Sequence, residues 1–114
     1  MKNSPEKMNL PYDLYEKQAA VAQALAHPVR IAILNVLKQG PHCVQEIADR
    51  VCGKQSNISR HLSMMVAAGI LTYEKQAQRV VYDIRTRCAL RFFDCLSDCL
   101  KEQIKNDHKV LRII

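Results

Sequence analysis

Three of the five cysteines in this 114-residue sequence, Cys88, Cys95 and Cys99, are spaced seven and four residues apart. On a helix of about 3.6 residues per turn, this spacing places the three thiols on one stripe. Cys95 and Cys99 are then about 6 Å apart along the helix axis, close enough for two thiolates to bind one soft ion. Cys88 lies about 10 Å further back, so it could join them only across a dimer axis. Thiolates favour As(III), Sb(III), Cd(II), Zn(II) or Cu(I) over hard cations.

The other two cysteines stand at opposite ends of another expected helix. Cys43 takes the N-cap position, and Glu46 three residues later fits a capping box. Because a helix N-terminus favours the thiolate form, Cys43 is a further candidate for a reactive thiol or an extra ligand. Cys52 is about 13 Å from Cys43 along that helix and is expected to pack near the following turn. Cysteine is also a small apolar residue that is often buried, so packing remains an alternative role for each of these thiols.

Composition narrows the class of protein. A chain of 114 residues that is rich in Leu, Ile, Val and Ala, with three glycines, four prolines and no tryptophan, is expected to form one mainly helical domain. No apolar run approaches about 18 residues, and the N-terminus lacks the apolar core of a secretory signal. We therefore expect a cytoplasmic protein with no membrane segment. An odd number of cysteines in a reducing compartment argues against a disulfide framework.

The charge distribution favours a polyanionic partner. The net charge is +6, and residues 53–81 carry four cations and one acid, Glu74, so half of the excess lies in this segment. A solvated surface is the alternative explanation. The four cations are Lys54, Arg60, Lys75 and Arg79.

An enzyme is not expected, because no nucleophile–base pair, glycine-rich phosphate loop or convergent carboxylates are evident.

Residues 40–71 have the pattern of two helices joined by a sharp turn. Val44, Ile47, Ala48 and Val51 form one apolar stripe, and Gly53 is expected to end this helix in a left-handed conformation. A second helix over about residues 56–68 should bury Ile58, Leu62, Met65 and Val66. Its opposite face is polar, which suits base edges in a DNA major groove. The candidate DNA contacts here are Lys54, Gln55, Ser56, Asn57, Ser59 and Arg60.

A β-hairpin is predicted directly after this helix-turn-helix. Residues 70–73 begin one strand, residues 79–84 form the next, and residues 75–78 make a polar tip of hairpin length. Two strands alone are marginal in water, so the hairpin must pack on the helices. A basic hairpin in this position is a wing, and Lys75, Gln78 and Arg79 are its candidate contacts to phosphates or the minor groove.

Three further helices complete the expected domain, which spans residues 11–105. The first runs from about Tyr12 to Ala26, where it ends because Pro28 disfavours helical geometry in the preceding residue, His27. A buried second helix then begins at Pro28. The last helix runs from about Thr86 to Ile104. Residues 1–10 are expected to form a flexible arm and residues 106–114 a tail. Apolar faces on the first and last helices could pair two subunits, through Leu14, Val21 and Leu25 and through Phe92, Leu96 and Ile104.

This order of elements resembles the ArsR/SmtB family of bacterial repressors over about residues 12–105. LAHPVRIAILNVL is similar to the LADPTRLRIL segment of that family, and VQEIADRV followed by QSNISRHLSMMVAAGIL is similar to its helix-turn-helix. QRVVYDI resembles the second wing strand. The resemblance implies a mainly α winged helix-turn-helix fold, α-α-α-α-β-β-α, that forms a homodimer through its first and last helices. It also implies binding to a palindromic double-stranded operator and release when an inducer ion or an oxidant reacts.

The resemblance leaves the inducer open. Arsenic- and cadmium-sensing members carry a Cys-Val-Cys box, but here Gln45 replaces its second cysteine after Cys43-Val44. The paired histidines of the Zn(II) and Ni(II) sites are absent near Asp94 and Asp98, and Asn35 replaces the second-helix cysteine of persulfide sensors. We expect a metal or metalloid ion, or an oxidant, at Cys95, Cys99, Cys88 or Cys43, with no metal needed for folding. The alternative is a winged-helix regulator whose signal does not involve thiols.

Overall fold

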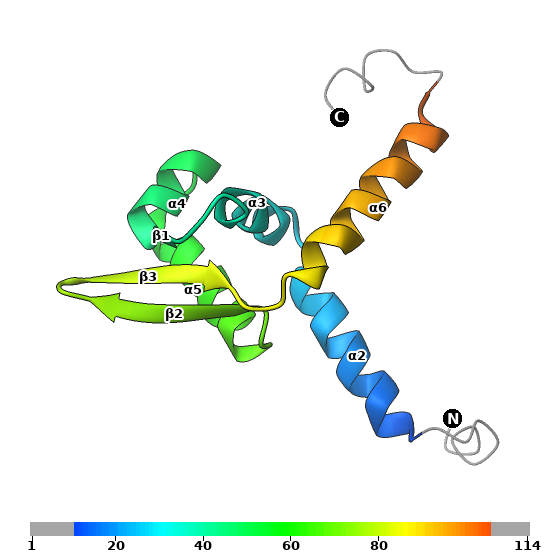
Figure 1. Cartoon of the computed structure of the whole chain (residues 1–114), viewed down its shortest axis with the longest axis horizontal. Helices are drawn as coiled ribbons and strands as arrows, with labels where there is room; N and C mark the ends of the chain where they lie inside the picture. Colours follow the sequence, from blue (N-terminus) through cyan, green and yellow to red (C-terminus); the bar gives the residue numbers. More distant parts are fainter. Residues whose placement is uncertain (1–10, 106–114) are drawn as a thin grey trace.

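The computed structural model describes residues 11–105, and this part of the chain forms five α-helices and three β-strands (Figure 1). The predicted order α-α-α-α-β-β-α is confirmed, with one short strand added before the third helix. The predicted arm (residues 1–10) and tail (residues 106–114) lie outside the described residues. The elements are α2 (Tyr12–Leu25), α3 (Pro28–Leu37), β1 (His42–Cys43), α4 (Val44–Val51), α5 (Gln55–Ala67), β2 (Leu71–Gln76), β3 (Arg79–Ile84) and α6 (Cys88–Gln103).

The core is built around α3, the helix predicted to be buried. Pro28 is its first residue, where the missing N–H costs no hydrogen bond, and Nδ1 of the preceding His27 accepts from the N–H of Val29 at 3.1 Å. Apolar side chains of α3 pack against α4 and α5 of the helix-turn-helix and against β3. The largest fully buried side chains are Ile33, Leu34, Leu37, Ile47, Ile58, Leu62, Met65, Ile70 and Leu71.

The turn between α4 and α5 differs from the prediction. Gly53 was expected to take the left-handed conformation, but Cys52 takes it instead, with φ 60° and ψ 45°. A β-carbon on Gly53 would lie 3.1 Å from Cδ1 of Ile58, so the glycine makes room for a core side chain rather than for a left-handed turn. Cys52 is exposed, which also corrects the expectation that it packs near the turn. Gly69, by contrast, follows the end of α5 in a left-handed conformation, with φ +81°.

The sheet has three strands in the order β1-β3-β2, all antiparallel. Strand β1 is only two residues long and was not predicted; it pairs His42 with Tyr82 and Cys43 with Val81. It joins the wing, formed by β2 and β3, directly to the start of α4. Strand β3 has the predicted bounds, whereas β2 runs further towards the tip than expected, to Gln76, which pairs with Arg79 and leaves Ala77 and Gln78 as the turn. Ala77 has φ 53°.

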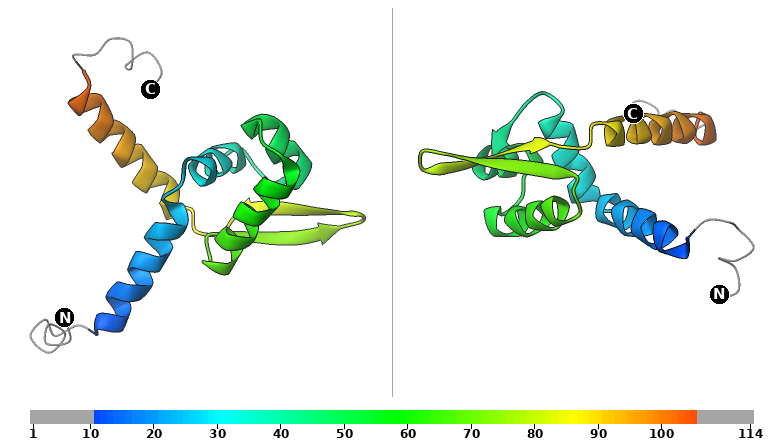
Figure 2. Two further views of the ribbon diagram at one scale, coloured as in Figure 1. Left: turned by 180° about the vertical axis from the view of Figure 1, so that it is seen from behind. Right: turned by 60° about the horizontal axis from the view of Figure 1, so that its bottom comes forward.

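Helices α2 and α6 project from the body as two arms (Figures 1 and 2). The Cα radius of gyration is 17.1 Å, whereas a compact chain of about 100 residues has about 13 Å. Each arm contributes one buried residue, Leu25 of α2 and Ala89 of α6. Leu25 therefore belongs to the core and not, as predicted, to a pairing surface. Among the described residues, the exposed large apolar side chains of the arms are Leu14, Val21, Phe92, Leu96 and Leu100, which we call the pairing face.

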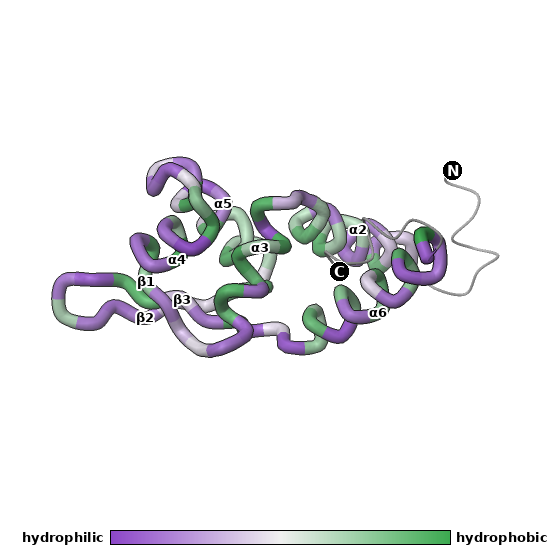
Figure 3. Tube along the Cα trace, turned by 90° about the horizontal axis from the view of Figure 1, so that it is seen from above, coloured by the Kyte–Doolittle hydropathy of each residue, from purple (hydrophilic) through white to green (hydrophobic). Residues whose placement is uncertain are grey.

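Hydropathy differs between these parts of the molecule (Figure 3). Apolar and hydrophilic segments alternate along α2 and α6, whereas the wing is mostly hydrophilic. Within residues 11–105 no single helix is long and apolar enough to cross a membrane. Helices α2 and α3 together have the required length and composition, but they are bent by 81°.

Candidate nucleic-acid interface

Helix α5 presents its predicted polar residues to solvent because its apolar residues face the core. Ile58, Leu62 and Met65 are fully buried, and Val66 is partly buried. These positions recur at helical spacing, so the opposite face of α5 points outward. Ser59 is half-buried; the other predicted contacts of this segment are exposed, namely Lys54, Gln55, Ser56, Asn57 and Arg60.

The N-terminus of α5 is suited to an anion. Its N-cap residue, Lys54, makes no side-chain capping hydrogen bond, and the first turn contains no acid. The first backbone N–H groups of the helix therefore have no side-chain partner, and the helix dipole adds partial positive charge there. A phosphate of a nucleic-acid backbone is the kind of group that such a terminus binds.

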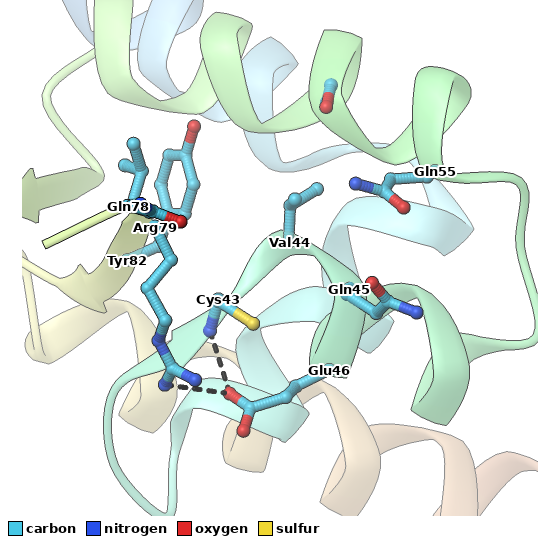
Figure 4. A pocket seen from close by; sticks show the side chains of 10 residues that line it. Cys43, Val44, Gln45, Glu46, Gln55, Gln78, Arg79 and Tyr82 are labelled. Carbon is cyan, nitrogen blue, oxygen red and sulfur yellow. Dashed lines mark hydrogen bonds and ion pairs between the residues drawn. The ribbon is translucent and has the colours of Figure 1, made fainter. Parts of the chain in front are cut away.

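An open pocket of about 670 Å³ lies between helix α5, the start of α4 and the wing (Figure 4). Gln55 and Ser59 reach it from the helix, and Gln78 and Arg79 reach it from the wing. The structure thus brings together four of the nine predicted DNA contacts, although they are far apart in sequence. Lys75 lies further along the wing, where it pairs with Val80 across the two strands. The remaining lining residues include Cys43, Gln45, Glu46 and Tyr82.

Glu46 lies in this site, a position that its place in the sequence does not predict. Its Oε1 accepts a hydrogen bond of 2.9 Å from the N–H of Cys43, which is the helix-cap contact expected from the capping-box pattern. The same oxygen lies 3.7 Å from Nη2 of Arg79 (Figure 4). The Cys43 N–H lowers the pKa of Glu46, the Cys43 thiol lowers it further, and Arg79 adds a smaller contribution. Glu46 is therefore a carboxylate that holds a cation of the wing.

The pairing of Glu46 with Arg79 predicts the effect of one substitution. In Glu46→Gln the amide still fits the capping box, while the negative charge beside Arg79 is lost. Exposed ion pairs contribute little because solvent screens them, so we expect DNA affinity to rise by no more than about fivefold. Fluorescence anisotropy with labelled DNA measures this change. Asp49→Asn removes an equal charge from the exposed face of α4 and is the control; an equal rise in both variants would show that only net charge matters.

The cysteines lie in two separate regions. Cys43 is half-buried at the start of α4, whereas Cys88, Cys95 and Cys99 are exposed on α6. Figures 1 and 2 show α4 and the free end of α6 on different sides of the body. Cys88 is the first residue of α6, two residues after the predicted start of the helix. Within the described residues no three His, Cys, Asp or Glu side chains come close enough together to bind a metal ion.

Arginines on α5 and on the wing are expected to contribute differently to DNA binding. If Arg60 contacts a guanine, Arg60→Ala should weaken specific binding by about 1–3 kcal/mol and relax the preference at one base pair. Arg79→Ala should weaken binding to all sequences alike and reduce the salt dependence by the equivalent of about one phosphate contact. Titrations of specific and scrambled DNA at several salt concentrations separate the two effects. Unchanged affinity in both variants would contradict this assignment.

The arrangement of α4, α5 and the wing defines a winged helix-turn-helix, a fold class that binds DNA through its second motif helix. Residues 27–73 match the family model described as "Bacterial regulatory protein, arsR family". The chain is 33% identical over 92 residues to an uncharacterized HTH-type transcriptional regulator, MJ1325, of Methanocaldococcus jannaschii; the match covers 80% of this chain and 91% of MJ1325. The chain therefore belongs to the arsR family of bacterial regulatory proteins.

Two further relatives are informative. The HTH-type transcriptional repressor SmtB of Mycobacterium tuberculosis is 36% identical over 72 residues, which cover 63% of this chain and 53% of that protein. The match thus spans about half the length of SmtB. The structure of the homodimeric winged helix-turn-helix DNA-binding domain of Mb0332 from Mycobacterium bovis superimposes with a TM-score of 0.73 at 26% identity. That likeness covers 85% of this chain and 90% of the Mb0332 domain.

Proposed function

We propose that this protein is a homodimeric transcriptional repressor that binds a palindromic operator and is released when a soft ion or an oxidant reacts with thiols of α6. The observation that carries the DNA-binding part is the placement of the polar face of α5 beside Arg79 and Gln78 of the wing. A single α5 contacts only a few base pairs. Two copies related by a two-fold axis enlarge the interface and require a palindromic site.

The pairing face supports the homodimer. Leu14 is 41% exposed, Phe92 50% and Leu100 47%, and the two arms give these side chains little cover within one subunit. Large apolar side chains that stay exposed on two projecting helices mark a protein interface. A second copy of the chain is the occupant that we propose, because the Mb0332 domain, which covers most of this fold, is homodimeric.

The α6 cysteines are the proposed sensor. Cys95 and Cys99 are one helical turn apart, exposed, and on the same arm as the pairing face. Two thiolates suit one soft ion but leave its coordination incomplete, and residues 11–105 of one subunit supply no third ligand nearby. The fit is therefore that of half a site, to be completed by thiols of the partner subunit, with Cys88 as the candidate. Cys43 lies at the interface with the wing and is a second candidate for oxidation or ligation.

An ion or a disulfide that links α6 to its partner would change the angle between the two subunits. The two α5 helices would then no longer fit successive major grooves, which are about 34–36 Å apart. By linkage, inducer and operator must weaken each other's binding by the same factor. The alternative is a regulator with another signal, in which the α6 cysteines serve the packing of the dimer.

One titration tests the proposal. The chain is mixed with DNA from upstream of its own gene, and As(III), Cd(II), Zn(II), Cu(I), Ni(II) and polysulfide are added in turn while the bound fraction is measured. We expect a specific complex that one soft ion or oxidant dissolves. A protein that binds this DNA no better than scrambled DNA would contradict the repressor, whereas specific binding that no reagent releases would contradict only the thiol sensor.

A further inference from the structure

The guanidinium of Arg30 is buried where α2, α3 and α5 meet. Arg30 is 8% exposed, and within residues 11–105 it is the only charged or polar residue that is buried. Its Nη1 donates to the carbonyl oxygens of Gln23 and Ala24, at 3.4 and 3.1 Å, near the end of α2. On the other side, its Nε donates to Nδ1 of His61 and its Nη2 to the sulfur of Met64, each at 3.1 Å. One side chain thus connects the arm α2 with the DNA-facing helix α5.

No carboxylate pairs with Arg30 among the ion pairs of the described residues. The C-terminal carbonyls of α2 stabilise the cation instead, with the help of the helix dipole. The hydrogen bond to His61 also determines where the His61 ring carries its proton. Because the Arg30 Nε–H donates to Nδ1, that nitrogen must be unprotonated, so His61 is neutral and carries its hydrogen on Nε2.

The surroundings of His61 oppose a positive charge. Burial lowers the pKa of His61 from the ordinary value of 6.5, and the charges of His27, Arg30 and Arg60 lower it further. The His27 ring, at the break between α2 and α3, lies 4.5 Å from the His61 ring. Helix α2 presents only carbonyl oxygens to the cluster, and no group of α4 or β2 is among the charges that act on His61.

We propose that Arg30 and His61 are positioning residues for DNA binding, which hold α5 against α2 while His61 is neutral, and that proton uptake by His61 breaks this connection and weakens operator binding. This inference rests on the proposed function. An imidazolium has hydrogens on both nitrogens, so it cannot accept from Arg30, and the two cations would then repel each other. Ile58, Leu62 and Met65 still hold α5 in the core, so the helix is reoriented rather than unfolded.

The sign of the pH effect follows from the lowered pKa of His61. Folding favours the neutral ring of His61. The hydrogen bond from Arg30 to His61 is therefore complete above the pKa of His61 in the unfolded chain, about 6.5, and is lost as the pH falls through the lower pKa of the folded chain. Protonation of histidines elsewhere would have the opposite effect, because added positive charge strengthens binding to a polyanion. Operator affinity that falls on acidification is therefore specific to this cluster.

The test compares the native chain with His61→Gln, whose amide oxygen can accept from Arg30 but does not titrate. Operator affinity is measured by anisotropy at about pH 7.5 and about pH 5.5, on either side of the usual histidine range. For the native chain we expect operator affinity to fall at least about fivefold, the lower end of typical coupling between two sites, and for His61→Gln less than about twofold. His42→Gln is the matched control, because the His42 ring lies outside the cluster, with its Nδ1 2.7 Å from the carbonyl oxygen of Gly40; this variant should keep the native pH dependence.

Two further measurements test the same switch, the first without operator DNA and the second without a variant. The urea midpoint of the DNA-free protein should fall over the same pH interval in the native chain and not in His61→Gln. An NMR titration of the His61 ring should show a lower midpoint with operator bound, as linkage requires. Equal pH dependence in the native chain and His61→Gln, or equal NMR midpoints, would overturn the proposal. A native chain that binds no operator at about pH 7.5 would overturn the proposed function, and the urea midpoints would then decide the His61 switch alone.

Discussion

Phe92→Asp is expected to convert the dimer into monomers and to weaken operator binding by about a hundredfold or more, because two linked half-sites gain about 10²–10⁴ over one. Phe92 is half exposed on α6 and packs against Phe93, which itself packs on the core. An aspartate there would place a charge in the proposed interface, where burying a carboxylate without a partner is strongly unfavourable. Sedimentation equilibrium and operator titration measure the two effects.

Phe92→Leu is the control for this experiment, since it keeps an apolar side chain at the pairing face. It should remain dimeric and bind operator within a few-fold of the native chain. Far-UV circular dichroism at high protein concentration shows whether the aspartate variant keeps its helices. A variant that stays dimeric and retains its operator affinity would show that the subunits pair elsewhere.

Cys95→Ser combined with Cys99→Ser is expected to remove the response to the inducer while DNA binding stays intact. Serine is close to cysteine in size but cannot supply a thiolate to a soft ion. Allosteric coupling of this kind is typically worth about 1–3 kcal/mol, a factor of about 5–150 in operator affinity, and we expect this factor to fall to one in the double variant. Operator titrations with and without the active reagent measure it.

Cys52→Ser serves as the matched control, because Cys52 is also exposed but lies at the end of α4, outside the proposed sensor. It should respond as the native chain does. A double variant that still releases DNA would point to Cys43 if the further change Cys43→Ser abolished the response. If that change had no effect, the signal would not involve these thiols.

Much of the fold could be predicted because periodic apolar positions determine it. Ile47 of α4 and Ile58 and Leu62 of α5 are fully buried, and the helix that begins at Pro28 forms the centre of the core. Such positions carry a strong signal, since one misplaced helix face would expose several large side chains. The polar face of α5 followed from the same pattern, because it is the opposite face of the helix.

The missed features depend on contacts between distant residues or on single residues. Strand β1 has two residues and so no periodicity, and the Glu46–Arg79 pair joins positions that meet only when the wing folds back on α4. The left-handed Cys52 was missed because the adjacent glycine is the usual candidate for that conformation. Arg30 did leave a signal, since a lone arginine in a helix that is apolar nearly all round must find buried partners.

The projecting arms have a consequence for how the protein behaves in a cell. Helices in proteins gain most of their stability from tertiary packing, and α2 and α6, with 14 and 16 residues, have one buried residue each. Newly made single subunits would therefore have fraying ends, open to proteases, until they meet a second copy. The fraction of the protein that escapes proteolysis should then rise steeply with its concentration. Amide hydrogen exchange in α2 and α6 should likewise slow as the protein concentration increases.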